Sequence, residues 1–282
     1  MYQYKHQKHT LQYITANMIY ILGTGYIAQA YAKYFIINSI PYRMISRKEV
    51  LYTNPITLAG FLNTAKPELL INAAGYVASG ASVYDEHKLA CIYSNGVFPG
   101  FIGELCQSMN IPWVHVSSGD IFTPSDTHAY TENDKPNNTK DYYNNSKIIG
   151  EDLLEKYSTA YICRFRRIFN NKDHPKNYIT QASKQTFTFT EIGSITNIDD
   201  GVKASIQLWD NKAPTGTYNI VNTGIVDVRG LLSMLVKYKL RTDIPDTISY
   251  GKIVLDNSKI NSIIPMIDVN ESLHNCIKTW NP

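Results

Sequence analysis

The stretch Met18–Phe35, MIYILGTGYIAQAYAKYF, decides the fold. It begins with an apolar run, turns at Gly23 and Gly25 in a G-x-G-x-x-A pattern that ends at Ala28, and continues with apolar residues at helical spacing. A strand, a tight glycine turn and a helix in this order form the dinucleotide-binding fingerprint. Gly23 allows the tight turn, and Gly25 lets the backbone approach a pyrophosphate at the positive helix N-terminus. We therefore expect a dinucleotide to bind here.

The second predicted strand, in PYRMISRKE, ends near Ser46. An NAD site usually carries Asp or Glu about 20 residues beyond the glycines, where the carboxylate binds the ribose 2′-hydroxyl. This chain has Ser46, Arg47 and Lys48 there instead. A hydroxyl and a guanidinium suit a 2′-phosphate. The sequence therefore favours NADP(H) over NAD(H).

Strand and helix signals alternate from residue 18 to residue 166, which predicts a parallel sheet covered on both faces. Buried strands are expected at 68–73, 112–118 and 160–166, and a long helix at 85–110 whose Gly96, Pro99 and Gly100 indicate a kink or a frayed start. We predict an α/β, Rossmann-like, doubly wound parallel sheet. Residues 18–166 would form an NADP(H)-binding Rossmann domain.

The alternation weakens from residue 167 onward, which predicts a smaller, mixed α/β, C-terminal substrate-binding lobe over 167–282. Part of this segment, about 197–223, is expected to return to the Rossmann domain. The predicted elements are helices at 179–184, 199–209, 226–238 and 269–280 and strands at 186–190 and 216–221. Residues 1–17 are polar and basic, without an apolar signal core, and we expect a flexible N-terminal extension.

Composition and charge exclude several kinds of partner. The formal net charge is +3 over 282 residues, too small to indicate a nucleic acid or an anionic membrane surface. No run approaches 18 consecutive apolar residues, so no transmembrane helix is predicted. The four cysteines form no C-x-x-C pair and the histidines lack metal-ligand spacing, so we expect reduced thiols, a cytoplasmic location and no metal.

Tyr143 and Lys147 are four residues apart in DYYNNSKIIGEDLL, a stretch expected to be helical from Asp141 or Tyr142. Positions i and i+4 share a helix face, so the phenol and the ammonium can point into one pocket. A nearby cation stabilises the phenolate and lowers the phenol pKa from about 10. The pair is therefore suited to moving a proton on or off an alcohol or ketone oxygen.

A hydroxyl group follows at the end of the strand PWVHVSS, where Ser117, Ser118, Gly119 and Asp120 stand. The carboxyl end of a parallel strand faces the ligand crevice. Ser118 can thus hydrogen-bond the oxygen that Tyr143 protonates.

This constellation resembles the extended short-chain dehydrogenase/reductases, over nearly all of residues 18–281. The likeness is greatest to enzymes that reduce a 4-keto-6-deoxy nucleotide sugar, the dTDP-4-dehydrorhamnose reductases and the plant-type UDP-4-keto-rhamnose epimerase/reductases. The similar stretches are KPELLINAAGYV, HVSSGDIF, YTENDKPNNTKDYYNNSKIIGEDLL, HPKNYITQ and GTYNIVNTGIV.

The resemblance implies roles for single residues. It makes Ser118, Tyr143 and Lys147 the catalytic triad and gives Asn95 the task of tying neighbouring backbone together. The expected cofactor contacts are Gly23, Gly25, Tyr26, Ile27, Ser46, Arg47, Asn72, Ala73, Ala74, Gly75, Tyr143 and Lys147. The expected substrate contacts are Ser118, Gly119, Asp120, Arg166 and Asn177, with Arg164 and Arg167 as further candidates for a diphosphate.

Two departures from the family bear on function. The family usually spaces its glycines as G-x-x-G-x-x-G, which leaves the lie of the pyrophosphate open here. Bifunctional relatives also carry a Cys near the segment 82–88 and a Lys after N-[FY]-I-T, whereas this chain has no Cys there and has Gln181 after NYIT. An amide cannot act as a base, and Tyr84 would be its partner. We predict reduction without epimerisation, and a solvated helix face for His87 and Lys88.

The predicted function is an NADPH-dependent 4-reductase of a 4-keto-6-deoxy nucleotide sugar in rhamnose-type deoxysugar biosynthesis. One alternative is a bifunctional 3,5-epimerase/4-reductase, or a nucleotide-sugar epimerase or dehydratase. An alternative of another class is an NADP-binding regulatory subunit without turnover. The partner expected is the nucleotide sugar, with no nucleic acid and no membrane. The sequence does not decide whether the nucleotide is UDP, dTDP or GDP, or whether the chain forms a homodimer.

Overall fold

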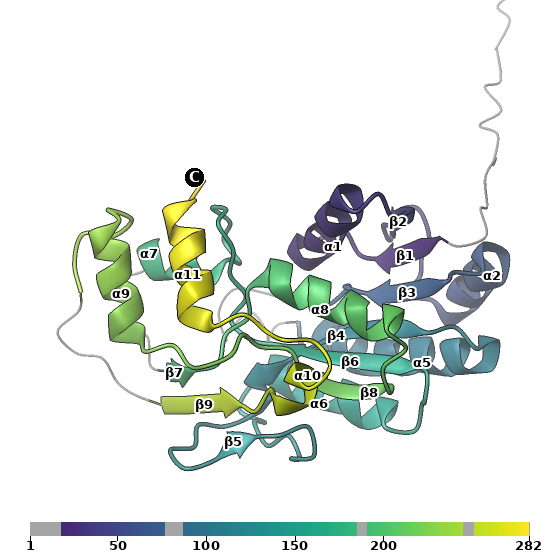
Figure 1. Cartoon of the computed structure of the whole chain (residues 1–282). Coiled ribbons are helices and arrows are strands. Elements are labelled where there is room, and N and C mark those ends of the chain that lie inside the picture. The colour runs from purple at the N-terminus through teal and green to yellow at the C-terminus, as the bar shows by residue number, and fades with distance from the viewer. Residues whose placement is uncertain (1–17, 77–86, 185–190, 245–250, 282) are drawn as a thin grey trace, which may run out of the picture.

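Six parallel strands form the main sheet in a computed structural model of the chain (Figure 1). Their order is β2-β1-β3-β4-β6-β8, and every neighbouring pair is parallel. The bounds are β1 Ile19–Leu22, β2 Tyr42–Ile45, β3 Leu69–Asn72, β4 Trp113–Ser118, β6 Ala160–Phe165 and β8 Gly216–Asn219. The order reverses between β1 and β3, and ligands bind beside the carboxyl ends of strands at such a switch point.

The structure describes residues 18–76, 87–184, 191–244 and 251–281. The extension at 1–17, the predicted strand at 186–190 and Tyr84 therefore lie outside the described residues. Within the described ranges, no helix is both long and apolar enough to cross a bilayer.

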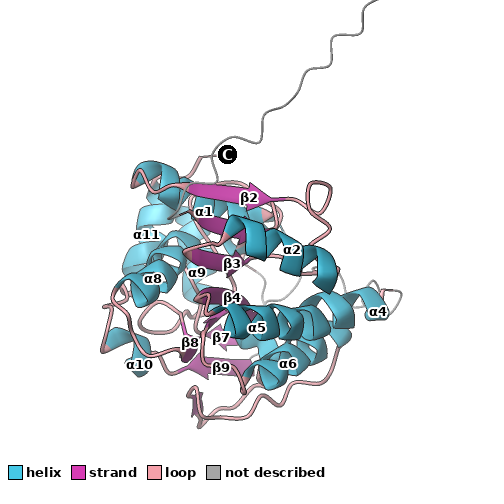
Figure 2. Ribbon diagram, turned by 90° about the vertical axis from the view of Figure 1, so that its right-hand side faces the viewer, coloured by secondary structure: helices cyan, strands magenta, loops and turns pink. Residues whose placement is uncertain are grey.

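Helices cover both faces of the sheet (Figure 2). One face carries α1 (Tyr26–Ile37), α8 (Ile198–Asp210) and α10 (Ser258–Asn261), and the other carries α2 (Pro55–Ala65), α5 (Phe98–Met109) and α6 (Tyr142–Leu154). Tyr31 and Phe35 of α1 and Val202 of α8 pack on the first face, and Ile102 of α5 and Leu154 of α6 on the second. The predicted α/β, doubly wound class is confirmed.

The helix expected at 85–110 has a wide turn in its first half. Its described part runs through α4 (Lys88–Cys91), the π-helix η1 (Ile92–Val97) and α5 without a break. At η1 this helix lies against α6, where a Cβ on Gly150 would collide with the carbonyl oxygen of Asn95. The close backbone contact requires glycine at that position. Single π-turns of this kind are frequent at functional sites.

The second lobe has a parallel sheet of its own, in the order β5-β9-β7. Its strands are β5 (Ala129–Tyr130), β7 (Glu191–Gly193) and β9 (Gly251–Leu255), none of which was predicted. Three helices complete it, α7 (Tyr178–Lys184), α9 (Val228–Lys237) and α11 (Val269–Lys278), and they share a separate apolar core. These elements gather at the side of the molecule away from α2 and α5 (Figure 1).

Residues 198–219 supply α8, which covers one face of the main sheet, and β8, its last strand, although they follow part of the second lobe in the chain. β8 pairs with β6, and α8 packs on α1, where the hydroxyl groups of Tyr31 and Ser205 are 2.7 Å apart. Lys33 of α1 also forms a salt bridge of 2.7 Å with Asp199 of α8. A strand pairing and a helix–helix contact thus join this segment to β6 and α1.

Candidate active site

A cavity of about 820 Å³ lies at the carboxyl ends of the central strands. This volume suits an extended ligand, since small-molecule sites commonly measure about 300–1,000 Å³. The segments that converge on it include the glycine turn after β1, the end of β3, the end of β4 and the start of α6. Both lobes contribute lining residues, because Lys176, Gln181 and Ile253 come from the second lobe.

The glycine turn has the geometry of a phosphate-binding loop. Gly23 has φ +106°, in the region that favours glycine, and a Cβ there would lie 3.1 Å from the amide nitrogen of Ala74. Gly25 is the N-cap residue of α1, and a Cβ built on it would meet nothing within 4 Å. Tyr26 and Ile27 follow and also line the cavity. The open space at Gly25 therefore faces the positive end of α1.

Ser46 and Arg47 line the same cavity just after β2. The turn is held to β2 by a hydrogen bond of 3.0 Å from the amide of Gly23 to the carbonyl of Ile45. Tyr52 lines the cavity nearby, and its ring stacks on Phe98 with 5.8 Å between centroids. Burial raises the pKa of Tyr52, against a smaller opposing effect of Arg47. This end of the cavity offers an aromatic wall, a hydroxyl and a guanidinium.

The segment after β3 passes close to α6. Ala73, Ala74 and Gly75 line the cavity, and a Cβ on Gly75 would lie 3.8 Å from Nζ of Lys147. Asn72 is buried instead, with its amide 3.1 Å from His115 and its carbonyl accepting from the amide of Ala74 at 3.2 Å.

Asn95 ties this segment to its surroundings. Its carbonyl oxygen accepts from the amide of Tyr76 at 2.8 Å, and its Nδ2 donates to the carbonyl of Tyr76 at 3.0 Å and to Ser146 at 3.1 Å. These bonds join η1, the segment after β3 and α6. The side chain is 1% exposed, so its contacts hold neighbouring backbone in place.

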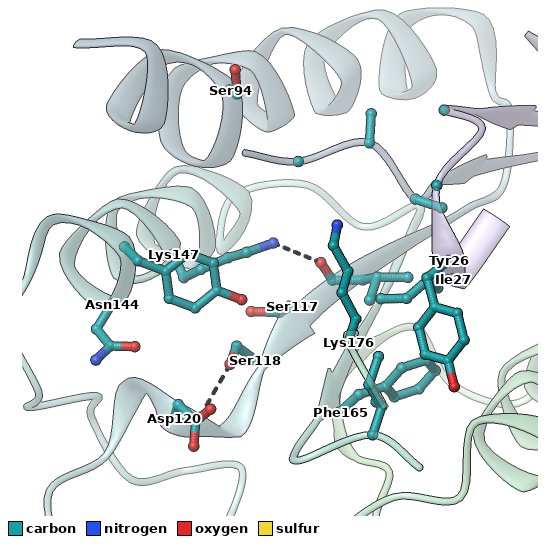
Figure 3. Close-up of a pocket in the computed structure, with 18 of the residues that line it drawn as sticks. Tyr26, Ile27, Ser94, Ser117, Ser118, Asp120, Asn144, Lys147, Phe165 and Lys176 are labelled. Atoms are coloured by element: carbon teal, nitrogen blue, oxygen red, sulfur yellow. Dashed lines mark hydrogen bonds between the residues drawn. The ribbon is translucent and has the colours of Figure 1, made fainter. Parts of the chain in front are cut away.

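Tyr143 and Lys147 both line the cavity from the first two turns of α6. Asp141 caps this helix by accepting from the amide of Asn144 at 2.7 Å. Nζ of Lys147 donates to the carbonyl of Val116 at 3.0 Å (Figure 3). Burial lowers the pKa of Lys147 to about 8, against the opposing effects of Glu151 and Cys91. While it is protonated, the buried ammonium stabilises a neighbouring anion such as a phenolate.

The two serines at the end of β4 have different partners. Ser117 donates to the buried carboxylate of Glu151 at 2.5 Å. Ser118 lines the cavity and accepts from the amide of Asp120 at 3.2 Å, as the cap of the 3₁₀-helix η2 (Gly119–Ile121) (Figure 3). Ser118 thus lies in one cavity with Tyr143 and Lys147.

Asp120 pairs with two arginines at the end of β6. Its carboxylate is 3.2 Å from Nε of Arg166 and 3.7 Å from Nε of Arg167. Burial acts to raise the pKa of Asp120, but Arg167 and Arg166 outweigh it and hold that pKa below its ordinary value. Asp120 and Arg167 line the cavity, and Arg167 has a left-handed backbone, with φ +43°.

Some of the residues expected at the site do not line the cavity. Gly119 is buried against Leu255 and Arg166, and the Arg166 guanidinium donates to the carbonyl of Ser194 at 2.9 Å. Asn177 is fully buried, and its amide donates to the carbonyls of Asn170 and Lys172. The side chains of Arg166 and Asn177, like that of Asn72, have their polar groups hydrogen-bonded inside the protein.

Other lining residues were missed by sequence reasoning. They are Lys140, Asn138, Asn144, Phe165, Lys176 and Ile253, among others. Asn138, Lys140 and Lys176 lie on loops and Ile253 comes from a distant strand, so no spacing signal marks them, whereas Asn144 and Phe165 lie on the predicted helix and strand that became α6 and β6. Gln181 also lines the cavity, and its Nε2 donates to the carbonyl of Pro175 at 2.9 Å. Among the described residues, no group of His, Cys, Asp and Glu is arranged to hold a metal ion.

The fold and the site together define a Rossmann-type α/β protein in which Ser118, Tyr143 and Lys147 line the same cavity as the glycine turn after β1. The chain belongs to the RmlD substrate binding domain family, which matches residues 17–226.

Two plant proteins from Arabidopsis thaliana are among the similar curated relatives. A bifunctional dTDP-4-dehydrorhamnose 3,5-epimerase/dTDP-4-dehydrorhamnose reductase is 26% identical over 185 residues, 63% of this chain and 61% of that protein. A trifunctional UDP-glucose 4,6-dehydratase/UDP-4-keto-6-deoxy-D-glucose 3,5-epimerase/UDP-4-keto-L-rhamnose-reductase is 25% identical, over 63% of this chain and 28% of that protein. The matched region thus spans less than two thirds of either relative.

Solved structures share the fold. The L780 UDP-rhamnose synthase of Acanthamoeba polyphaga mimivirus has a TM-score of 0.80 at 19% identity, over 94% of this chain and 100% of that one. A dTDP-4-dehydrorhamnose reductase of Bacillus anthracis, in complex with NADP, has a TM-score of 0.76 at 15% identity, over 94% and 98%.

Proposed function

We propose that this protein is an NADPH-dependent reductase that converts the 4-keto group of a 4-keto-6-deoxy nucleotide sugar to an alcohol. One observation carries the proposal: Ser118, Tyr143 and Lys147 line the same cavity as the phosphate-binding turn. Family membership and the reductase names of the plant relatives support the same reaction and substrate class.

The residues present fit a reduced dinucleotide. A Cβ on Gly25 would project into open space at the N-terminus of α1, which leaves room for a pyrophosphate against backbone N–H groups. Ser46 and Arg47 line the cavity at the end of β2 and would bind an adenosine 2′-phosphate. NADP(H) is therefore the cofactor that we propose over NAD(H). When bound, it supplies the hydride for C4 of the sugar.

The protein's own part in the reaction is to handle the proton and the charge on the ketone oxygen. Tyr143 donates its phenolic proton to that oxygen as the alcohol forms. Lys147, buried and cationic, stabilises the phenolate that remains. Ser118 donates a hydrogen bond to the same oxygen, and stabilisation of this kind is worth about 3–4 kcal/mol per donor in other enzymes.

The site supports reduction without epimerisation. Epimerisation at C3 and C5 needs a base that removes a proton from carbon. Gln181 lines the cavity at the position after NYIT, but its amide cannot accept a proton and donates to Pro175. Incubation with the keto sugar in ²H₂O separates the two functions. We expect no deuterium at C3 or C5, and incorporation at either carbon would assign epimerase activity.

The reaction is tested by following NADPH oxidation against a panel of 4-keto-6-deoxy nucleotide sugars with UDP, dTDP and GDP, with products identified by NMR. We expect one or more to be reduced at C4. Tight NADPH binding with no oxidation across the whole panel would instead favour a regulatory subunit without turnover.

A further inference from the structure

Five basic side chains line the cavity, and four of them have a proposed role, an ion-pair partner or a position away from the phosphate-binding turn. Arg47 follows β2, Lys147 belongs to the catalytic helix, Arg167 pairs with a carboxylate, and Lys140 lies on the loop before α6. Lys176 has no such role. It comes from the second lobe, and its ammonium end points into the cavity (Figure 3).

The loop that carries Lys176 is attached to the phosphate-binding turn. The imidazole of His174 stacks on the ring of Tyr26, with centroids 4.2 Å apart and planes 7° from parallel. The amide of Lys176 donates to Nδ1 of His174 at 3.1 Å. Since Tyr26 is the first residue of α1, this contact sets Lys176 beside the helix end that faces the pyrophosphate position.

The loop is also fixed on the other side of Lys176. Asn177 is buried and donates to the carbonyls of Asn170 and Lys172 at 2.9 and 2.6 Å. Gln181 donates to the carbonyl of Pro175 at 2.9 Å. The backbone of Lys176 is therefore held in place while its side chain stays exposed.

The phosphate-binding turn lacks a cation of its own. Its sequence GTGYIA contains no Lys or Arg, and the first turn of α1, residues 26–29, has no basic side chain either. A helix N-terminus carries about half a positive charge, against about two negative charges on a pyrophosphate. We propose that Lys176 supplies the missing charge by binding the pyrophosphate of the dinucleotide across the cavity. This inference rests on the proposed function, because it requires a dinucleotide in the cleft.

The test measures equilibrium binding to the full-length protein without sugar substrate. Lys176→Gln is compared with Lys172→Gln, a matched loss of charge on the same loop outside the cavity lining. We expect Lys176→Gln to raise the Kd for NADPH and the Kd for NADH by the same factor, about tenfold. This is the effect of losing one charge-assisted hydrogen bond. The difference in Kd between the wild-type protein and Lys176→Gln should become smaller as salt is added. Binding of adenosine 2′-monophosphate, which has no pyrophosphate, should be unchanged, and Lys176→Arg should retain most of the affinity.

The possible failures are distinguishable. If the wild-type protein binds NADPH and Lys176→Gln has the same Kd, the inference is wrong while the proposed function stands. A raised KM for the nucleotide sugar with an unchanged NADPH Kd would assign Lys176 to the substrate diphosphate instead. An equal loss of NADPH affinity in Lys172→Gln would show that the effect comes from the protein's net charge and not from a contact of Lys176, and the inference would be wrong. A wild-type protein that binds no dinucleotide would overturn both proposals.

Discussion

The carboxylate of Glu151 accepts hydrogen bonds from Nε and Nη2 of Arg164 at 2.6 to 3.1 Å, and both side chains are buried. Glu151 lies on α6 one turn beyond Lys147, which is one turn beyond Tyr143, so the three share a helix face. Glu151 also accepts from Ser117, the neighbour of Ser118. The ion pair thus joins α6, β4 and β6 directly behind the candidate catalytic groups.

Breaking this ion pair from one side should destabilise the protein strongly. Glu151→Gln or Arg164→Met leaves an uncompensated buried charge, for which we expect a loss of about 3–5 kcal/mol in the free energy of unfolding. The double variant Glu151→Gln/Arg164→Met should recover much of that loss. Urea unfolding of the four proteins measures the coupling. Additive losses in the double variant would show that the two groups act independently.

Removing the phenolic hydroxyl should stop catalysis and spare cofactor binding. Tyr143→Phe deletes the proton donor, and general acid catalysis is worth about 10²–10⁴-fold in rate. We expect kcat to fall by that range while the Kd for NADPH stays within about twofold of wild type. Single-turnover oxidation of bound NADPH gives the first quantity and fluorescence titration the second. Wild-type rates in Tyr143→Phe would exclude its assignment as the proton donor.

The two glycines of the phosphate-binding turn should respond differently to alanine. At Gly23 a Cβ meets the backbone of Ala74 and the backbone is left-handed, so Gly23→Ala should cost about 1–3 kcal/mol of stability. At Gly25 a Cβ meets no atom within 4 Å, so Gly25→Ala should leave the melting temperature unchanged. The added methyl group would occupy the space proposed for the pyrophosphate, so the affinity for NADPH should fall. Calorimetry and titration of both variants test this. Unchanged NADPH affinity in Gly25→Ala would place the pyrophosphate elsewhere.

Arg47 should set the preference between the two nicotinamide dinucleotides. It lines the cavity after β2, and Arg47→Ala removes the guanidinium proposed to bind the 2′-phosphate. We expect the Kd for NADPH to rise about tenfold, with that for NADH nearly unchanged, since only NADPH carries this phosphate. An equal rise in the Kd for NADPH and for NADH would mean that Arg47 contacts a group that the two dinucleotides share.

Lys147 should make stability depend on pH in the alkaline range. Burial lowers its pKa from 10.5 to about 8, so between these values the unfolded chain binds more protons than the folded one. The free energy of unfolding should then rise with pH across this window, and the full penalty of burying the ammonium is present below it. Lys147→Met should lack that rise. The wild-type minus variant difference, from urea unfolding at each pH, should increase between pH 8 and pH 10.5; a flat difference would contradict the lowered pKa.

The sequence by itself determined those features that depend on near neighbours. The glycine turn after β1 and the pair Tyr143 and Lys147 were predictable because strand and helix periods place residues two to four positions apart on known faces. The doubly wound sheet followed from the alternation of strands and helices. Local pattern was thus enough for the fold class and for the first candidates at the site.

Only the tertiary structure decided which polar side chains face the cavity and which are used inside the protein. Arg164 is buried in hydrogen bonds to Glu151 of α6, and Asn177 in hydrogen bonds within its own loop, whereas Lys176 reaches the cavity through the stacking of His174 on Tyr26. The sheet β5-β9-β7 was missed for the same reason, since β5 pairs with β9 more than 120 residues away. Such contacts depend on how distant segments pack, and a short stretch of chain carries no periodic signal for its remote partners.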